Sequence, residues 1–158
     1  MSNSVPRAGT LVIGVGNEFR SDDGVGILIA RRLRNRLPGD VRVVEASGDG
    51  GALLEALKAA NSTILIDAVR SGAAPGTIHC IDAAREPLSG DLFHSSSHEF
   101  GVADAVEMAR ALGQLPASLT VYGVEGVNFA PGLMLSESVA RAAEEVERQI
   151  ALHLGAIP

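Results

Sequence analysis

Three side chains of this 158-residue chain are of the types that bind divalent metal ions: Asp23, Asp67 and His98. Asp23 comes soon after the apolar run 11–15, Asp67 directly follows the apolar run 62–66, and His98 follows three serines. Two carboxylates and one imidazole form a competent set of metal ligands that leaves positions open for water or substrate. A helix that begins at His98 would favour the neutral imidazole, which is the form that a metal ion needs.

Each of these residues also has an ordinary structural explanation. Asp23 could interact favourably with the positive end of its own helix dipole, and Asp67 could cap a turn. The segment 96–99, Ser-Ser-His-Glu, has the pattern of a capping box, in which His98 would be incidental. His94 lies close by, and periodicity does not choose between the two histidines. Only the joint placement of the two carboxylates and a histidine favours a metal site.

Other kinds of site fit the residues less well. A dinucleotide-binding turn needs a third glycine where this chain has Phe19, and Asp22 and Asp23 would repel a pyrophosphate, although Glu45 could accept a ribose hydroxyl. No Gly-Lys-Ser/Thr follows the turn, no second histidine completes a zincin motif, and no Gly-x-Ser-x-Gly elbow is present. Cys80, the single cysteine, excludes an internal disulfide, and we expect it to be a small buried residue of a strand.

Composition and charge narrow the class of protein. With 46% apolar and 20% charged residues the chain is expected to be globular, and its net charge of −6 argues against a nucleic-acid partner. The arginine cluster 31–36 lies at the end of a predicted helix, where cations suit the helix dipole. No apolar run is long enough to span a membrane, and no signal-peptide core is seen, so we expect a cytoplasmic protein without a membrane partner.

The elements that must position these residues alternate between strands and helices. Strands are predicted near 11–15, 41–45, 62–66, 77–81 and 119–124, and helices near 25–37, 53–57, 98–112 and 136–154. Ser21 or Asp22 is expected to cap the first helix, which places Asp23 in its first turn. This alternation predicts one α/β domain over residues 1–158, with a mostly parallel, twisted five-stranded sheet and helices on both faces. Ligands of such sheets bind outside the carboxyl ends of the strands, where the three metal-binding side chains are expected to converge.

Four segments together resemble the hydrogenase maturation proteases, the endopeptidases that trim nickel–iron hydrogenase large subunits. They occur in this order and cover nearly the whole chain from about Leu11 to the last helix. The segments are Gly14-Val15-Gly16-Asn17, Asp22-Asp23-Gly24-Val25-Gly26, Ile64-Leu65-Ile66-Asp67-Ala68 and Ser97-His98-Glu99-Phe100-Gly101-Val102-Ala103-Asp104.

The resemblance implies a metal site and catalytic centre built from Asp23, Asp67 and His98. It implies that the metal is nickel already inserted into the hydrogenase large-subunit precursor, so that nickel arrives with the substrate and is not a tightly held cofactor. The protein would then remove a C-terminal extension as a monomer or weak oligomer. Whether the metal polarises the carbonyl or activates a water, or a carboxylate acts as general base, stays open.

The chain departs from the family pattern at two places. Many members carry glutamate where Asp23 stands, and many have Asp-Gly-Gly-Thr where this chain has Glu45-Ala46-Ser47-Gly48. Two alternatives remain. A peptidyl-tRNA-hydrolase-like protein also opens with a strand and a Gly-x-Gly-Asn turn, but it would need a histidine soon after the turn and a basic surface. A non-catalytic chaperone would only sense nickel loading.

Overall fold

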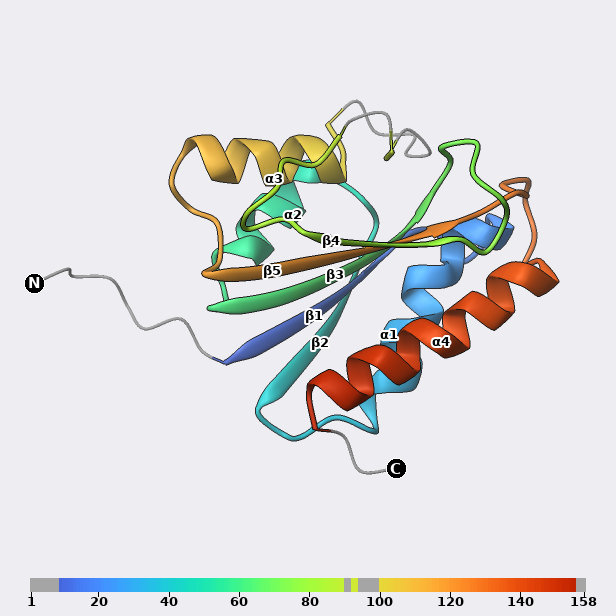
Figure 1. Ribbon diagram of the computed structural model, residues 1–158, viewed down its shortest axis with the longest axis horizontal. Coiled ribbons are helices and arrows are strands. Elements are labelled where there is room, and N and C mark those ends of the chain that lie inside the picture. Colours follow the sequence, from blue (N-terminus) through green and yellow to red (C-terminus); the bar gives the residue numbers. More distant parts are fainter. Residues whose placement is uncertain (1–8, 90–91, 94–99, 156–158) are drawn as a thin grey trace, which may run out of the picture.

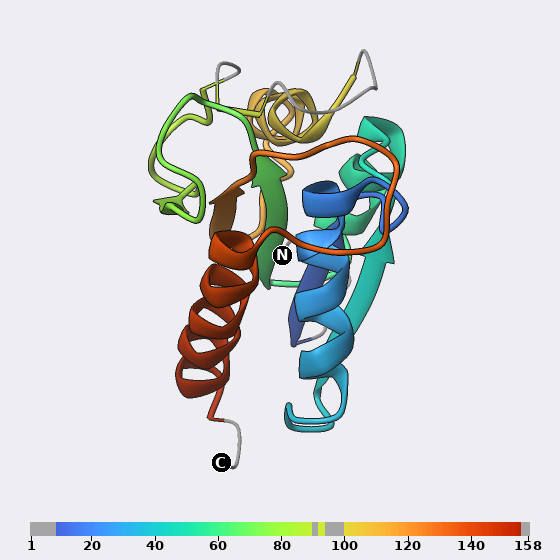
Figure 2. The ribbon, with the colours of Figure 1, turned by 90° about the vertical axis from the view of Figure 1, so that its right-hand side faces the viewer.

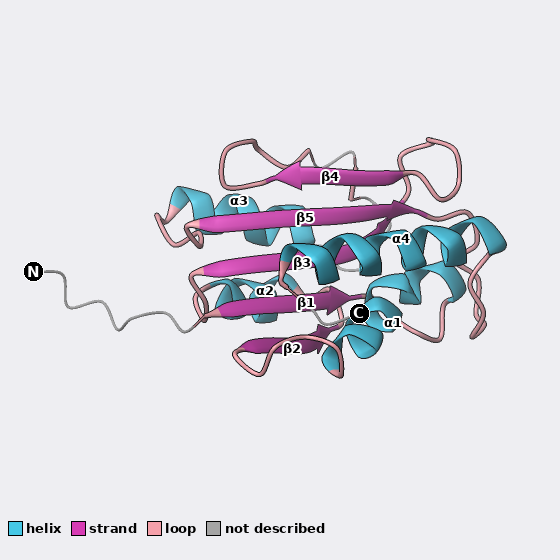
Figure 3. Ribbon diagram, turned by 60° about the horizontal axis from the view of Figure 1, so that its bottom comes forward, coloured by secondary structure: helices cyan, strands magenta, loops and turns pink. Residues whose placement is uncertain are grey.

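A five-stranded sheet lies between two layers of helices in the computed structural model, which describes residues 9–89, 92–93 and 100–155 (Figure 1). Strands β1 (Thr10–Val15), β2 (Val41–Ala46), β3 (Ser62–Val69) and β5 (Ser118–Glu125) are parallel. At one edge β4 (Ile78–Asp82) pairs antiparallel with β5 (Figure 3). The predicted fold class is therefore confirmed.

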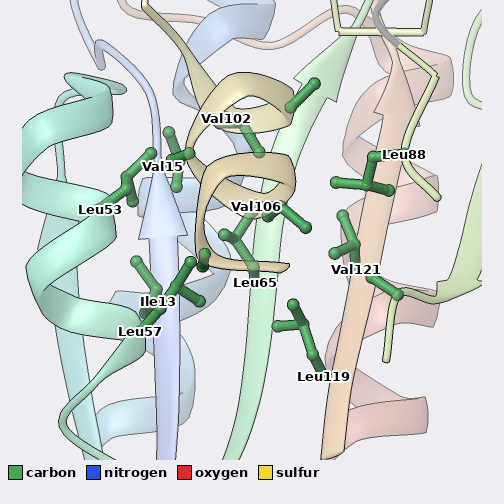
Figure 4. Packing of buried hydrophobic residues seen from close by; sticks show 14 of the residues in the cluster. Ile13, Val15, Leu53, Leu57, Leu65, Leu88, Val102, Val106, Leu119 and Val121 are labelled. Atoms are coloured by element: carbon green, nitrogen blue, oxygen red, sulfur yellow. The ribbon is translucent and has the colours of Figure 1, made fainter. Parts of the chain in front are cut away.

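One face of the sheet is covered by α2 (Gly50–Leu57) and α3 (Val102–Ala111). Because side chains alternate along a strand, every second residue of each strand points to this face. Figure 4 shows the resulting apolar packing, which combines side chains from β1, β3 and β5 with those of the two helices. The labelled members include Ile13, Leu65 and Val121 of the sheet and Leu53, Leu57, Val102 and Val106 of the helices.

The opposite face is covered by α1 (Val25–Arg34) and α4 (Glu137–His153), which lie side by side (Figure 2). Val25, Ile29 and Leu33 of α1 are fully buried in this second core. Glu147 of α4 bridges the two helices, because it pairs with Arg36 at 2.6 Å and with Arg32 at 3.8 Å. The arginine cluster thus takes part in ion pairs in addition to lying at a helix end.

The order of the strands, β2-β1-β3-β5-β4, places the turning point of the topology between β1 and β3. The chain leaves β1 for β2 on one side and then crosses back to β3 on the other. At such a switch point the loops that follow the two strands diverge and leave a crevice outside their carboxyl ends. The loop after β1 and the end of β3 carry Asp23 and Asp67.

Three expectations about local structure were wrong. A short 3₁₀ turn, η1 (Ser21–Gly24), precedes α1, and neither Ser21 nor Asp22 caps the helix, because both side chains bind the distant segment 126–136. Helix α3 begins at Val102, where the Gly101 backbone N–H donates to Asp104, rather than at residue 98. Cys80 is exposed, because it lies on the edge strand β4.

None of the helices within the described part of the chain is long and apolar enough to cross a membrane.

Candidate active site

A cavity of about 500 Å³ opens at the carboxyl ends of β1, β2 and β3. Both Asp23 and Asp67 line it, so the structure brings together two of the three predicted site residues. The segment 45–48 at the end of β2, whose sequence differs from the family pattern, also lines the cavity. The remaining wall comes from Val15, Gly16, Asn17, Glu18, Phe19, Arg20, Ile27 and Arg31.

The turn after β1 positions Asp23 through backbone geometry. Gly16 has a φ of 145°, and a Cβ at this position would lie 1.9 Å from the carbonyl oxygen of Asp23. Only glycine fits such a close approach. The Asn17 backbone N–H donates to Oδ2 of Asp23 at 2.9 Å, and Oδ1 of Asn17 accepts from the Phe19 N–H at 2.9 Å. The turn therefore folds back on the Asp23 carboxylate and holds it at the cavity.

Asp67 is the second carboxyl group of the cavity, and it is buried, with 5% of its surface exposed. It lies near the end of β3, and its Oδ1 accepts a hydrogen bond from the Ala68 backbone N–H at 2.8 Å. Burial, and then the negative charge of Asp23, raise the pKa of Asp67 well above its ordinary value. A buried acidic group whose ionisation is opposed by a neighbouring carboxylate marks a place where a cation would be favourable.

His98, the third predicted ligand, and His94, its alternative, lie outside the described residues. Within the described ranges 9–89, 92–93 and 100–155, no group of three or more His, Cys, Asp or Glu side chains is arranged to hold a metal ion. The donor set that is described consists of the Asp23 and Asp67 carboxyl groups. Oxygen donors of this kind suit a divalent cation when further ligands complete the set.

Charged side chains at and beside the wall of the cavity form ion pairs with one another. The Arg31 guanidinium donates to both carboxylate oxygens of Glu18, at 2.6 and 2.9 Å, and its Nε donates to Glu45 at 3.1 Å. Arg34 donates to the other oxygen of Glu45 at 3.0 Å. The hydrogen bond from Arg31 lowers the pKa of Glu45, so this carboxylate stays ionised and paired. Glu45, a possible ribose acceptor from sequence, is therefore engaged by two arginines.

Asp22, which the sequence suggested only as a possible cap of the first helix, is a structural residue. Its side chain is fully buried and accepts hydrogen bonds from the Val127 and Asn128 N–H groups and from both the N–H and the hydroxyl of Ser136, at 2.7–3.0 Å. Burial by itself would raise the pKa of Asp22, but these hydrogen bonds outweigh it and lower the pKa below its ordinary value.

Asp22 thereby fixes the segment 126–136, which connects β5 to α4 and passes over the first turn of α1 (Figure 2, orange). Three backbone hydrogen bonds add to this attachment, from Ser21 N–H to Gly132, from Asp22 N–H to Asn128 and from Gly132 N–H to Phe19. More than one hundred residues separate these partners, so no local pattern could have indicated them.

Glu125 forms a second buried carboxylate cluster, at the end of β5. Its carboxylate accepts hydrogen bonds from the backbone N–H and the hydroxyl of Ser71, and it lies 3.2 Å from Nε2 of His79. Burial by itself would raise the pKa of Glu125, but hydrogen bonds, the largest of them from Ser71, together outweigh it and lower the pKa. The cluster anchors the loop between β3 and β4, and none of its three members lines the cavity.

The fold and the cavity together define a class of protein: an open α/β sheet that carries a pair of carboxyl groups at the switch point of its strands. A family model described as hydrogenase maturation protease matches residues 27–153. The chain belongs to this family. The matched range includes Asp67 and His98 and begins after Asp23.

Individual relatives agree with the family model. The chain is 31% identical to the hydrogenase 2 maturation protease of Escherichia coli K12 over 145 residues, which are 89% of this chain and 87% of that protein. It is also 31% identical to the hydrogenase expression/formation protein HupD of Rhodobacter capsulatus, over 75% of this chain and 58% of that protein. The chain therefore spans less than two thirds of the length of some relatives.

Solved structures have the same architecture. An endopeptidase from Escherichia coli is similar with a TM-score of 0.80 and 30% identity, over 94% of this chain and 96% of that one. The hydrogenase maturating endopeptidase HybD from E. coli is similar with a TM-score of 0.74 and 27% identity over the same shares. These matches favour the maturation proteases over the peptidyl-tRNA hydrolases as the family of this chain.

Proposed function

We propose that the protein is an endopeptidase that removes the C-terminal extension of a nickel–iron hydrogenase large-subunit precursor after nickel has been inserted. Membership of the maturation protease family supports this activity, as does the similarity to proteins described as maturation protease and as endopeptidase. In this proposal nickel belongs to the substrate, and the protease recognises it as the sign of a loaded precursor.

The observation that carries the proposal is the pair of carboxyl groups, Asp23 and Asp67, in one cavity at the switch point of the sheet. Asp67 has a raised pKa because it is buried beside the charge of Asp23. A divalent cation entering the cavity would offset that charge and allow Asp67 to release its proton. The pair therefore fits a site that receives a metal ion with its substrate. His98 would be the third ligand.

The residues of the chain would position the scissile bond. Asp23, held by the Asn17 N–H, and Asp67, held by the Ala68 N–H, would bind the metal-bearing end of the precursor from two strands. A divalent ion held by these residues would supply Lewis-acid chemistry, which polarises a neighbouring carbonyl.

The test is cleavage of a nickel-loaded precursor, followed by the loss of mass of the large subunit. The wild type is expected to cleave, whereas Asp23→Asn, Asp67→Asn and His98→Ala are each expected to lose most of the rate. Asp40→Asn is the matched control, because Asp40 is an exposed carboxylate just before β2, at the amino ends of the parallel strands. Its rate should equal that of the wild type.

Two results would overturn the proposal. Undiminished cleavage by all three site variants would refute the assignment of the site. Tight binding of the loaded precursor by the wild type without any change in its mass would show a chaperone that senses nickel loading rather than a protease.

A further inference from the structure

A second, smaller hollow of about 260 Å³ adjoins the cavity and shares part of its wall. Glu18, Ile27 and Arg31 line both spaces, so the Glu18–Arg31 ion pair lies between them. The rest of the second hollow is largely apolar. Its leucines are Leu28, Leu133 and Leu135.

Exposed apolar side chains border the two hollows. Phe19, which lines the cavity, is 63% exposed, and Leu133, which lines the second hollow, is 73% exposed. Met134, the next residue along the chain, is 81% exposed. The two loops that carry these side chains are joined by the hydrogen bond of 2.8 Å from the Gly132 N–H to the Phe19 carbonyl. Large apolar side chains gathered beside a cavity mark an interaction surface more often than the same side chains scattered singly.

We propose that this second hollow and its apolar border, Phe19, Leu133 and Met134, bind apolar residues of the precursor segment next to the bond that is cut. This inference rests on the proposed function, because the precursor is the molecule that must enter the neighbouring cavity. An extended peptide advances about 3.3 Å per residue, so a chain held at Asp23 and Asp67 reaches an adjoining hollow within a few residues.

The charges of the site favour an apolar occupant over a charged one. Arg31 and Glu18 satisfy each other through two hydrogen bonds, and Arg31 also donates to Glu45. The Glu18–Arg31 pair between the two hollows therefore offers a ligand no unpaired charge. The second hollow is lined beyond this pair by leucine side chains. Such a subsite gains affinity by removing apolar surface from water.

The border is held in place before any substrate arrives. The segment 126–136 is attached to the turn after β1 by Asp22 and by backbone hydrogen bonds, as described above. A surface that is already ordered loses little conformational entropy on binding. The apolar border can therefore contribute to binding of the precursor without taking part in the chemical step.

The test measures precursor cleavage at varied precursor concentration for Leu133→Ser and for Leu152→Ser. Leu152 is the matched control, because it is 68% exposed and lies near the end of α4, which runs back from the carboxyl ends of the parallel strands (Figure 1). Leu133→Ser is expected to raise KM roughly tenfold with an unchanged kcat, which is the sign of lost uniform binding. Leu152→Ser should leave both constants unchanged. Because both side chains are exposed, neither change should affect folding.

A second arm identifies the contact directly. Precursors carrying serine at successive positions around the cleaved bond are compared with the wild type and with Leu133→Ser. The inference expects one apolar position whose replacement weakens binding to the wild type but has little further effect on Leu133→Ser, because the pair is coupled. An unchanged KM for Leu133→Ser, an equal change in Leu152→Ser, or the absence of any coupled position would overturn it.

Binding of the precursor, measured by calorimetry, separates this inference from the proposed function. If the wild type binds but does not cleave, the endopeptidase proposal fails, while a weaker affinity of Leu133→Ser still supports the docking surface. If the wild type cleaves and Leu133→Ser binds equally well, the endopeptidase proposal stands and the docking surface is refuted.

Discussion

Asp22→Asn would test whether the carboxylate next to the site residue Asp23 is a structural anchor. The substitution keeps the size of the side chain but replaces one acceptor oxygen with an NH₂ group. In the structure Oδ2 of Asp22 accepts three hydrogen bonds, from Val127 N, Asn128 N and the Ser136 hydroxyl, and Oδ1 accepts one from Ser136 N. The best orientation of the amide keeps its oxygen at the place of Oδ2 and turns its NH₂ toward Ser136 N.

The expected cost follows from these contacts. Leaving the Ser136 N–H without an acceptor in a buried place costs about 1–3 kcal/mol. The other three hydrogen bonds change from charge-assisted to neutral, and each loses roughly 0.5–1 kcal/mol. The free energy of unfolding should therefore fall by about 4 kcal/mol, in the range known for breaking a buried polar network. For a chain of this size that is a drop of roughly 12 °C in melting temperature.

Asp23→Asn is the control within the same Asp-Asp pair. The backbone N–H of Asn17 donates to Asp23, and an amide oxygen can accept the same bond, so its cost should stay below about 1 kcal/mol. Thermal and urea unfolding measure both variants. The two adjacent substitutions should thus have different effects: Asp22→Asn should lower stability, and Asp23→Asn should abolish cleavage. Equal stability of the two variants would refute the role assigned to Asp22.

The effect of pH provides a second check on Asp22. Its pKa in the folded protein lies below the ordinary value of 3.8, so the ionised group stabilises the fold above that value. This contribution is lost as the pH falls through the folded pKa. The difference in stability between the wild type and Asp22→Asn should therefore be full at neutral pH and should shrink in acid. A difference that does not change with pH would mean that the charge is not responsible.

Three further predictions follow from the same structure. Asp67→Asn should raise the melting temperature at neutral pH and abolish cleavage. The folded pKa of Asp67 is raised, so its ionisation costs stability as the pH rises above the ordinary carboxyl range. In acid, the melting temperature of Asp67→Asn should therefore no longer exceed that of the wild type. Gly16→Ala should lower the melting temperature by several degrees and abolish cleavage, because the added Cβ would meet the Asp23 carbonyl at 1.9 Å, whereas Gly39→Ala, with open space around it, should do neither. Cys80 should react fully with a thiol reagent in the native protein, because it is exposed; slow labelling that requires unfolding would contradict the edge position of β4.

Patterns of residues along the chain were sufficient to predict the architecture. The apolar runs 11–15 and 62–66 predicted buried parallel strands, because a strand covered on both faces has no solvent side to keep polar. The amphipathic spacing of the helices and the turn residues between them predicted the alternation that makes an α/β sheet. The placement of Asp23 and Asp67 at one cavity also followed, since the ends of parallel strands meet at one edge of the sheet.

Local sequence was a poorer guide where the tertiary environment decides the conformation. Ser21 and Asp22 looked like caps of the first helix, but contacts with the segment 126–136 take both side chains. Cys80 looked buried from its apolar neighbours, yet its strand has a partner on one side only. Glu125 showed no signal at all, because its partners are Ser71 and His79 on other segments.

The sequence by itself determined the class of fold, the family and the identities of the candidate metal-binding side chains, because these depend on residue types and on spacing along the chain. Only the tertiary structure decided the role of Asp22, which was expected to cap the first helix and instead holds the segment 126–136 in place. Two adjacent carboxylates are chemically identical in the sequence. Asp22 meets three backbone N–H groups and a hydroxyl from the far end of the chain, while Asp23 turns toward Asp67, and long-range packing alone makes that difference.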